Sequence, residues 1–597
     1  MKTRDKISEK YKWDLSSLYK SEENFDNDFN KVLKKVEELK EYKGKITQTA
    51  ENLLQTIELS LSIKRIVNNL YAYSKMKSDE NTKNSKYQKM FAKIQSLNVN
   101  VNEELSFIVP EILRESKDKI KLFLNNEDDL KLYKKHLEDI LRQKDHFLSE
   151  DKEKIMAQAG DIMSGPSNTF NMLNNADFTF PKIKDENDED LQLTHGNFIK
   201  TLKKNDRDVR KNAFKAYYSV YEKHENGLAS NLVTQIKTDC FSAKVRDYKN
   251  SLTQALDKNN IPTKVYNSLI KAVHDNIGAM HKYMRLKKEF LDLDELHLYD
   301  IYVPLVKDVD FEFPFDESKD ILLDAFEILG KDYTTTVKKS FNNRWIDVYE
   351  TKGKRSGAYS FGTYDSNPYI LLNYQDNLNS LYTLAHEMGH SMHSHLTRNN
   401  QPYVYGNYSI FLAEIASTTN EALLTDYFLN TLDNKKRKLY ILNDYLEKFR
   451  GTLFRQTMFA EFEKFMHRKI ENSEPLTSDI LKEKYKNLNK IYYGDDVYID
   501  EEIALEWARI PHFYYNYYVY QYATGFAAAI NITDRIKNKE DNIVKKYIEF
   551  LSSGSEKYPI DLLKDLGLDM TSVNVVTKAL KRFKYLVDEM EELIENY

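Results

Sequence analysis

Apolar residues recur along most of the chain at the three- and four-residue spacing that gives a helix one hydrophobic face. The pattern runs from about residue 20 to residue 160 and again from residue 378 to the end. One such stripe has Lys and Glu between the apolar positions Phe25, Phe29, Val32, Leu33 and Val36. Only 17 Gly and 11 Pro interrupt the 597 residues, which favours long helices over many short strands. We therefore expect a mainly α fold.

The helical pattern breaks at Ser167–Lys184. Here Phe178 and Phe180 alternate ahead of Pro181, as in a strand or an extended connection. The acidic run Asp185–Asp190 follows and is most simply a solvated loop. These breaks predict a domain boundary close by.

We place that boundary near residue 200, between an N-terminal helical domain of residues 1–200 and a second domain of residues 201–597. In the second domain, Ser251–Pro262 is expected to be a polar connection, and Val265–Phe290 one long amphipathic helix.

The segment Lys354–Tyr374 follows a different pattern from its surroundings. It contains two strand-like runs, Gly357–Tyr364 and Tyr369–Asn373, joined by an Asp-Ser-Asn-Pro turn. Helical spacing resumes at Leu378. We therefore expect a small β-sheet next to the helix that follows.

Charge and composition exclude some kinds of partner. The 88 basic and 93 acidic residues leave a net charge of −5, which gives no reason to expect nucleic acid or an anionic membrane as a partner. No stretch approaches the roughly 20 apolar residues of a membrane helix, and the charged N-terminus lacks a signal-peptide pattern. A single cysteine, Cys240, cannot form an internal disulfide. We expect a cytoplasmic protein, and the oligomeric state stays open.

A metal-binding motif lies in LYTLAHEMGHSMHSHL, residues 381–396. His386 and His390 are four residues apart, so they lie one above the other on a single helical face. Two imidazoles in this arrangement can direct nitrogens at one ion about 2.0–2.1 Å away. Glu387 lies about 100° around the helix, where it can take a proton from water on the metal, as the HExxH pattern of zinc peptidases requires. We expect one Zn²⁺ ion, with Glu387 as the general base.

Catalytic zinc needs a third protein ligand and an open fourth position. His393 shares the face of His386, but three ligands along one straight helix would spread over about 10 Å. A metzincin site would need glycine at position 393 and histidine at position 396, where the chain has His393 and Leu396. Both arrangements are therefore excluded.

The next helix, expected over residues 411–429, offers a better third ligand. Glu414 and Glu421 are seven residues apart on one side of it. Two acids on a largely apolar helix are costly to bury unless they meet a cation or hydrogen-bond donors. We predict that Glu414 is the third ligand and that Glu421 accepts the second N–H of a ligand histidine. The alternative for each is an ordinary solvent-exposed carboxylate.

The motifs HEMGHSMH and NYSIFLAEIASTTNE together resemble the oligoendopeptidase F family within the thimet-oligopeptidase-like zinc metallopeptidases. The similarity runs from KWDLSSLY at residues 12–19 to the tyrosine-rich C-terminal segment. It implies that a glutamate placed like Glu414 completes the zinc site. It also implies a large multi-helical, clam-like fold with zinc on the floor of a deep channel, and cleavage of short peptides in the cytoplasm.

Peptide hydrolysis also needs hydrogen-bond donors for the developing oxyanion. The segment Arg509–Gly525 is rich in tyrosine, and the family has a His and Tyr pair in this region. The resemblance matches His512, Tyr517 and Tyr520 to these donors, with Tyr517 and Tyr520 matched by their YxxY spacing. Tyr514 and Tyr515 remain alternatives.

The strand pair is a second candidate for substrate contact. An open edge at Gly357, Ala358 and Tyr359 would bind a peptide backbone by adding a strand, and Gly357 would permit close approach. The alternative is an ordinary hairpin whose backbone is paired internally.

Two other functions stay open. One is a helical zinc carboxypeptidase or dipeptidyl carboxypeptidase, which would need a cationic group for the terminal carboxylate. The other is a catalytically silent binding protein with a structural zinc, which would have four protein ligands.

Overall fold

The computed structural model describes residues 2–306, 309 and 311–595. Its contacts divide the chain into two compact units, each made of three segments. Unit 1 comprises residues 1–147, 311–424 and 532–566, and unit 2 comprises residues 148–310, 425–531 and 567–597. The interleaving arises because segments far apart in sequence pack together, which a pattern along the chain does not reveal. The two-domain division at residue 200 stays a prediction.

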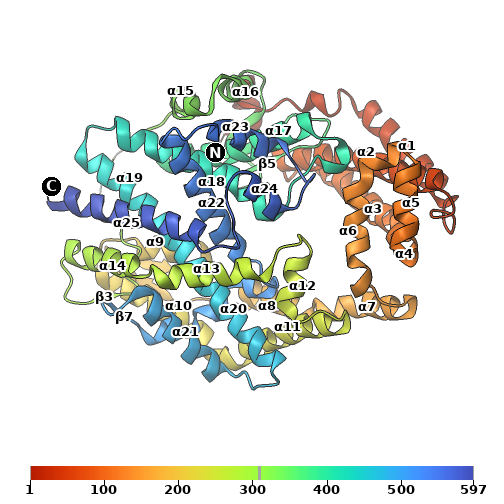
Figure 1. The fold of residues 1–597 in the computed structure, drawn as a ribbon. Coiled ribbons are helices and arrows are strands. Elements are labelled where there is room, and N and C mark those ends of the chain that lie inside the picture. Colours follow the sequence, from red (N-terminus) through yellow and green to blue (C-terminus); the bar gives the residue numbers. More distant parts are fainter. Residues whose placement is uncertain (1, 307–308, 310, 596–597) are drawn as a thin grey trace. The chain divides into compact units, whose positions relative to one another are not determined.

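Helices make up 71% of the structure and strands 4%, which confirms the mainly helical prediction (Figure 1). Unit 1 contains α1 (Glu22–Lys40), α2 (Ala50–Glu80), α3 (Ser85–Leu105), α4 (Ile108–Arg114), α5 (Lys117–Asn126), α6 (Lys134–Arg142), α15 (Phe315–Phe326), α16 (Lys331–Asn342), α17 (Leu378–Asn400), α23 (Ile543–Ser552) and α24 (Pro559–Asp565). The helices α18 (Ile410–Thr431) and α22 (Tyr520–Lys537) pass through unit boundaries. No helix in the described ranges combines the length and apolar character needed to span a bilayer.

Unit 2 is built in the same way from amphipathic helices, with two small two-stranded sheets. Its helices are α7 (Glu150–Met163), α8 (Gly165–Met172), α9 (His195–Leu202), α10 (Arg207–Lys223), α11 (Glu225–Val245), α12 (Ser251–Asp257), α13 (Thr263–Asp275), α14 (Gly278–Phe290), α19 (Lys435–Lys448), α20 (Arg455–Glu471), α21 (Ser478–Tyr493) and α25 (Asn574–Glu595). The sheets pair β1 (Lys182–Lys184) with β2 (Asp190–Gln192), and β3 (Leu296–His297) with β7 (Val497–Tyr498).

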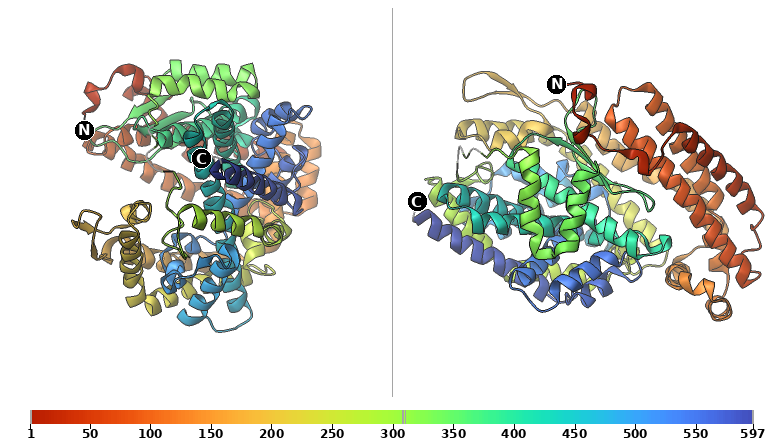
Figure 2. Two further views of the ribbon diagram at one scale, coloured as in Figure 1. Left: turned by 90° about the vertical axis from the view of Figure 1, so that its left-hand side faces the viewer. Right: turned by 90° about the horizontal axis from the view of Figure 1, so that it is seen from above.

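The N-terminal helices of unit 1 show why the apolar stripes fold as they do. In Figure 2, α1, α2 and α3 lie side by side. Helix α1 starts at an N-cap, where Ser21 Oγ accepts the N–H of Asn24, and it buries Phe25, Val32 and Val36. Leu33, which the stripe included, is 46% exposed. The helix therefore turns a narrower apolar face to its neighbours than the sequence indicated.

A three-stranded sheet forms the part of unit 1 that supports the HExxH helix. Its strand order is β4 (Ile346–Tyr349), β6 (Tyr369–Tyr374) and β5 (Tyr359–Phe361), with β4 parallel and β5 antiparallel to β6. Helix α17 packs against β5 and β6. This confirms the predicted small sheet beside that helix. It also leaves β5 as an edge strand within the described residues.

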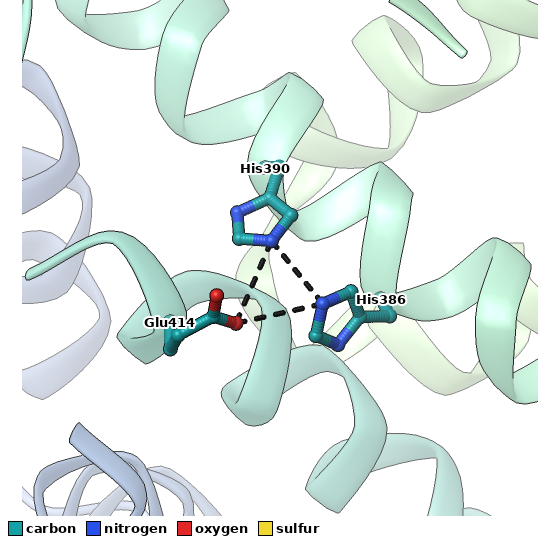
Figure 3. Close-up of side chains that lie close together, drawn as sticks. All are labelled: His386, His390 and Glu414. Atoms are coloured by element: carbon teal, nitrogen blue, oxygen red, sulfur yellow. Dashed lines mark hydrogen bonds and ion pairs between the residues drawn. The ribbon is translucent and has the colours of Figure 1, made fainter. Parts of the chain in front are cut away.

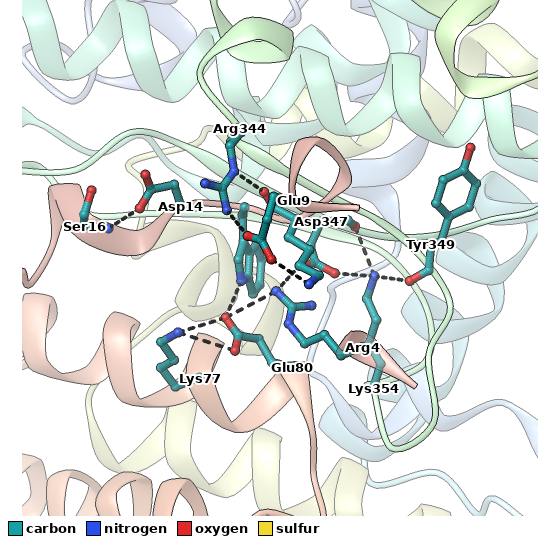
Figure 4. Close-up of polar contacts among 12 residues, drawn as sticks. Arg4, Glu9, Asp14, Ser16, Lys77, Glu80, Arg344, Asp347, Tyr349 and Lys354 are labelled. Atoms are coloured by element: carbon teal, nitrogen blue, oxygen red, sulfur yellow. Dashed lines mark hydrogen bonds and ion pairs between the residues drawn. The ribbon is translucent and has the colours of Figure 1, made fainter. Parts of the chain in front are cut away.

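The N-terminal residues are held to this sheet by a buried ion cluster (Figure 4). Asp347 of β4 is 2% exposed and pairs with Arg4 at 2.5 Å and with Lys354 at 2.8 Å. Burial raises the pKa of Asp347, but the charges of Lys354 and Arg4 outweigh burial and lower it. At the exposed side of this cluster, Arg344 pairs with Glu9 at 3.0 Å. Opposite charges that pair inside the protein avoid the cost of isolated buried ions.

Three predicted elements differ from the structure, each for a local reason. Val265–Phe290 is two helices, α13 and α14, because weak helix formers at Asn276 and Gly278 interrupt it. The predicted polar connection Ser251–Pro262 begins with helix α12, whose N-cap Asn250 accepts the N–H of Thr253. The segment Ser167–Lys184 is helical in α8 and a following π-turn before it becomes extended. Capping side chains start helices that are too short to show a periodic stripe.

Candidate metal centre

Helix α17 holds both histidines of the HExxH motif on one face. Asn377 caps its N-terminus by accepting the N–H of Ser380. The opposite side is buried in the core through Leu381, Leu384, Ala385, Met388 and Met392. This packing fixes the rotation of the helix about its axis. His386 and His390 therefore share a defined orientation.

A glycine allows the next helix to approach this face closely. A Cβ at Gly389 would lie 2.5 Å from the Cα of Ser417 and 2.6 Å from the carbonyl oxygen of Ala416, both on α18. These distances are too short for any side chain, so α17 and α18 meet backbone to backbone at this point. Glu414 lies on the same α18, one turn before Ser417. The small residue inside HEMGH was a signal for this contact that the sequence analysis did not use.

Three donor atoms converge between the two helices, as Figure 3 shows. The Nε2 atoms of His386 and His390 are 3.2 Å apart, and Oε2 of Glu414 lies 3.5 Å from the first and 3.6 Å from the second. Ligands at about 2.0–2.1 Å from a tetrahedral zinc ion are separated by roughly 3.4 Å. The donor set and its spacing therefore fit a divalent metal ion.

Glu421 lies two helical turns after Glu414 on α18 and orients His386. Its Oε1 lies 2.6 Å from Nδ1 of His386. This hydrogen bond places the proton on Nδ1 and leaves the lone pair of Nε2 directed at the cluster. Sequence spacing predicted this contact, and the structure brings the two side chains together.

The charges around the cluster also suit a cation. Burial lowers the pKa of His386, but the hydrogen bond and charge of Glu421 outweigh burial, and with Glu387 and Glu414 they raise it to about 9. Burial, reinforced by His386, lowers the pKa of His390 to about 4. The surrounding carboxylates thus favour a positive charge at His386, whereas His390 stays neutral. A bound metal ion would neutralise the surrounding carboxylates.

Glu387 lies beside the cluster and faces the sheet. Its side chain is buried, with 8% of the residue exposed. Burial raises its pKa to about 7, against the opposing charge of His386 and a hydrogen bond from the N–H of Ser360 on β5. A carboxylate with a pKa near neutrality suits a group that accepts and returns a proton.

His393 is not part of the cluster. It is 1% exposed and stacks on Tyr408 with ring centroids 3.5 Å apart. The structure therefore places it in the core, in line with its exclusion as a ligand.

The predicted substrate strand is partly engaged within the fold. The carbonyl oxygen of Gly357 accepts a hydrogen bond from Nδ2 of Asn373 at 2.8 Å. The hydroxyl of Tyr359 donates a hydrogen bond to the carboxylate of Asp79 at 2.8 Å. Gly357 has a φ of +84° and open space around its missing Cβ. The left-handed backbone accounts for a glycine at this position, and its role in the close approach of a peptide stays a prediction. Ala358 lies between these two residues, just before the paired part of β5.

The predicted oxyanion donors divide into two groups in unit 2. Tyr517 and Tyr520 are 2% and 3% exposed and pack on Tyr266, with ring centroids 5.5 Å and 5.2 Å away. The ring neighbours of His512, at 5.9–6.1 Å, are Tyr515, Tyr518 and Tyr522.

The sequence analysis did not select Tyr518 and Tyr522. Tyr515 and Tyr518 precede α22 in irregular backbone, so helical spacing in the sequence could not have identified them as neighbours of His512. Tyr514, the other alternative from the sequence, is buried and stacks on Phe170 with ring centroids 4.7 Å apart. Its hydroxyl accepts a hydrogen bond from Nδ2 of Asn231 at 3.1 Å.

Comparisons with known proteins identify the family. The family model described as "Peptidase family M3" matches residues 201–582, and the model "Oligopeptidase F" matches residues 111–180. The chain belongs to the oligoendopeptidase F group of peptidase family M3, as its motifs predicted.

Relatives match over nearly the whole length. Oligopeptidase PepF of Bacillus subtilis is 47% identical, over 99% of this chain and 88% of its own. Group B oligopeptidase PepB of Streptococcus agalactiae is 42% identical, over 99% and 98%. The solved oligoendopeptidase-F of Enterococcus faecium is 38% identical with a TM-score of 0.76, over 96% of this chain and 100% of its own. A solved structure from Chlamydophila abortus is 36% identical with a TM-score of 0.92, over 99% and 100%.

Proposed function

We propose that this protein is a zinc-dependent endopeptidase that hydrolyses oligopeptides, with Glu387 as the general base. The observation that carries the proposal is the convergence of His386 Nε2, His390 Nε2 and Glu414 Oε2 within 3.2–3.6 Å of one another, next to a buried carboxylate. The names of the relatives, oligopeptidase and oligoendopeptidase F, support the substrate class. Short peptides and a cytoplasmic location are part of the same proposal, and the deep channel stays a prediction.

The roles of the chain's own residues follow from their positions. His386, His390 and Glu414 would hold the ion, and Zn²⁺ when bound supplies a Lewis acid that polarises the peptide carbonyl and makes water more acidic. Glu387 accepts the proton of the attacking water on its carboxylate and delivers it to the leaving amine. Glu421 keeps the proton on Nδ1 of His386, so that Nε2 remains a ligand. The N–H of Ser360 orients the carboxylate of Glu387.

Oxyanion donors are proposed from the aromatic segment Arg509–Gly525. The resemblance assigns His512, Tyr517 and Tyr520. Burial raises the pKa of both Tyr517 and Tyr520, and their rings face the core of unit 2. Both side chains are therefore shielded from solvent. Tyr515, which is 49% exposed, and Tyr518, which is partly exposed, stand beside His512 and are therefore the better candidates.

For the substrate backbone, we retain the edge of β5 from Gly357 to Tyr359 as the docking strand. In the described residues β5 pairs with β6 on one side alone. Main-chain pairing along such an edge accepts many side chains, as a general oligopeptidase requires. The occupied carbonyl of Gly357 leaves Ala358 as the residue of this trio best placed to pair.

A Glu387→Gln variant tests the general base. It should bind zinc as the wild type does but lose turnover by at least about 10²-fold, because the amide cannot accept the water proton. The control is Glu317→Gln, at an exposed carboxylate on α15. Zinc content by metal analysis and cleavage of a mixed peptide library by mass spectrometry are the readouts. Full activity in Glu387→Gln would refute the proposed role.

The two competing functions are separated by simple measurements. A structural zinc site has four protein ligands, whereas the cluster found among the described residues has three. Inhibition by phenanthroline without unfolding would exclude the silent binding protein. Products from the middle of long peptides, with free or amidated C-termini, would exclude a strict carboxypeptidase.

A further inference from the structure

An arginine on the HExxH helix has no acidic partner in the part of the chain that the structure describes. Arg398 lies eight residues after His390 on α17. Its Nη2 donates a hydrogen bond to the carbonyl oxygen of Gly362 at 3.1 Å. Nη1 is shielded from solvent and has no partner among the described residues. No Asp or Glu of the described chain pairs with this guanidinium, and burial lowers the pKa of Arg398.

Other arginines of unit 1 do have acidic partners. Arg65 donates to the carboxylate of Asp365 through Nε at 2.9 Å and also through Nη2. Arg355, just before β5, is 54% exposed and lies 3.6 Å from Asp79. Burying a cation without a counter-ion is costly, so a buried guanidinium normally meets a carboxylate or phosphate. Arg398 is half-buried, and its Nη1 is shielded from solvent without a carboxylate partner in the described residues.

Arg398 lines a cavity of about 330 Å³ within unit 1. Ser360 on β5, Gly362, Ser394 and Tyr408 also line this cavity. Arg398 is the one charged residue among those that line it, so the cavity carries a positive charge and no acid. Gly362 makes room for the guanidinium, since a Cβ there would lie 3.1 Å from Nη1.

The cavity is continuous with the proposed catalytic edge. Ser360 donates its N–H to Glu387 and shares a 2.8 Å hydrogen bond with Ser391 through the two hydroxyls. Gly362, which holds Arg398, is two residues further along the chain, a distance of about 7 Å in an extended strand. A peptide lying along β5 would have one residue opposite Ser360. A second peptide residue, two to three positions away, would then lie beside Arg398.

We infer that Arg398 and this cavity form a subsite for a carboxylate of the peptide substrate. The inference rests on the proposed peptidase function and adds to it a preference for acidic groups at a set distance from the cleaved bond. A peptide parallel to β5 would bring its C-terminal carboxylate to Gly362. An antiparallel peptide would bring an acidic side chain that precedes the cleaved bond.

The experiment uses matched peptides. One pair differs in a free or amidated C-terminus, and further pairs exchange Glu for Gln at one position. In one of these pairs, the wild-type enzyme should prefer the acidic peptide over its neutral partner by about ten- to hundredfold in kcat/KM, the range expected for a charge-assisted hydrogen bond. The difference should lie mainly in KM. The preferred pair identifies the source of the carboxylate and the direction of the peptide.

Variants then assign the preference to a residue. In Arg398→Gln the acid-to-neutral ratio should fall close to one, and Arg398→Lys should retain part of it. Arg355→Met removes a paired arginine before β5 and should keep the wild-type ratio. A ratio of one in the wild type, a full ratio in Arg398→Gln, or a loss in Arg355→Met instead would each overturn the inference. The wild-type measurement decides even if Arg398→Gln does not fold.

A binding measurement separates this inference from the proposed function. Fluorescence anisotropy of the same labelled peptides is measured on zinc-loaded Glu387→Gln protein. Tighter binding of the acidic member supports the subsite even if wild-type protein cleaves none of the peptides, a result that would refute the peptidase proposal. Equal binding of both members, or no binding, would overturn the subsite.

Discussion

The HExxH helix and the tyrosine-rich segment carry the same kind of sequence signal but differ in how well that signal can be read. In α17 and α18 the spacing of His386, His390, Glu414 and Glu421 follows regular helical geometry, and the four side chains meet. In the aromatic segment the backbone is irregular. Asn516 and Tyr517 both have positive φ, and α22 starts three residues after Tyr517. Spacing indicates a shared face only where the backbone is regular.

The largest effect is expected from a substitution in the regular region formed by α17 and α18. Glu414→Gln should abolish zinc binding at stoichiometric metal and reduce peptide cleavage by at least about 10³-fold, because a neutral amide is a poor ligand for zinc. Zinc content of the folded protein and cleavage of a quenched fluorescent peptide measure this. The exposed Glu317→Gln serves as the matched control. Full zinc occupancy in Glu414→Gln would show that the third ligand lies elsewhere.

The next effect tests the irregular region. Either Tyr515→Phe or Tyr518→Phe should lower kcat by about 10²–10³-fold, the loss expected when one oxyanion donor is removed. Tyr517→Phe and Tyr520→Phe should change kcat only a few-fold, since both hydroxyls lie in the core. Steady-state kinetics on one peptide compares all four. A large loss confined to Tyr517→Phe or Tyr520→Phe would restore the assignment made from the YxxY spacing.

A smaller effect is expected at Glu421, which contacts a proposed ligand of the metal and not the metal itself. Glu421→Gln should weaken zinc affinity by about 10–100-fold, because His386 loses the carboxylate that orients it. Competition with a chelator measures the affinity. Added zinc should recover much of the activity, a recovery that Glu414→Gln should not show. Unchanged affinity would mean that the 2.6 Å contact with His386 does not tune the site.

The smallest effect concerns the contact between the two helices. Gly389→Ala should lower the free energy of unfolding by about 1–3 kcal/mol, because its Cβ would overlap the backbone of α18 at Ala416 and Ser417. Calorimetry of Gly389→Ala and of Gly227→Ala, where a Cβ meets nothing within 4 Å, provides the comparison. Equal melting temperatures would show that the helices can separate at no cost.

Several local features were predictable because they depend on neighbours in sequence. Helical periodicity placed α17 and α18, and the four-residue spacing placed His386 and His390 on one face. The turn between β5 and β6 followed from Asp, Asn and Pro. The same reasoning wrongly predicted one helix where the structure has α13 and α14. The two weak helix formers between them were not enough to indicate the break.

The sequence by itself determined the helical class of the fold, the small sheet, the motif on α17 and the family to which the chain belongs. Tertiary structure alone decided that Gly389 brings α18 against α17, that Tyr517 and Tyr520 face the core, and that Nη1 of the half-buried Arg398 is shielded without an acid in the described residues. The physical reason is range. Backbone propensity and periodicity act over a few residues, whereas burial and charge pairing depend on which distant segments pack together.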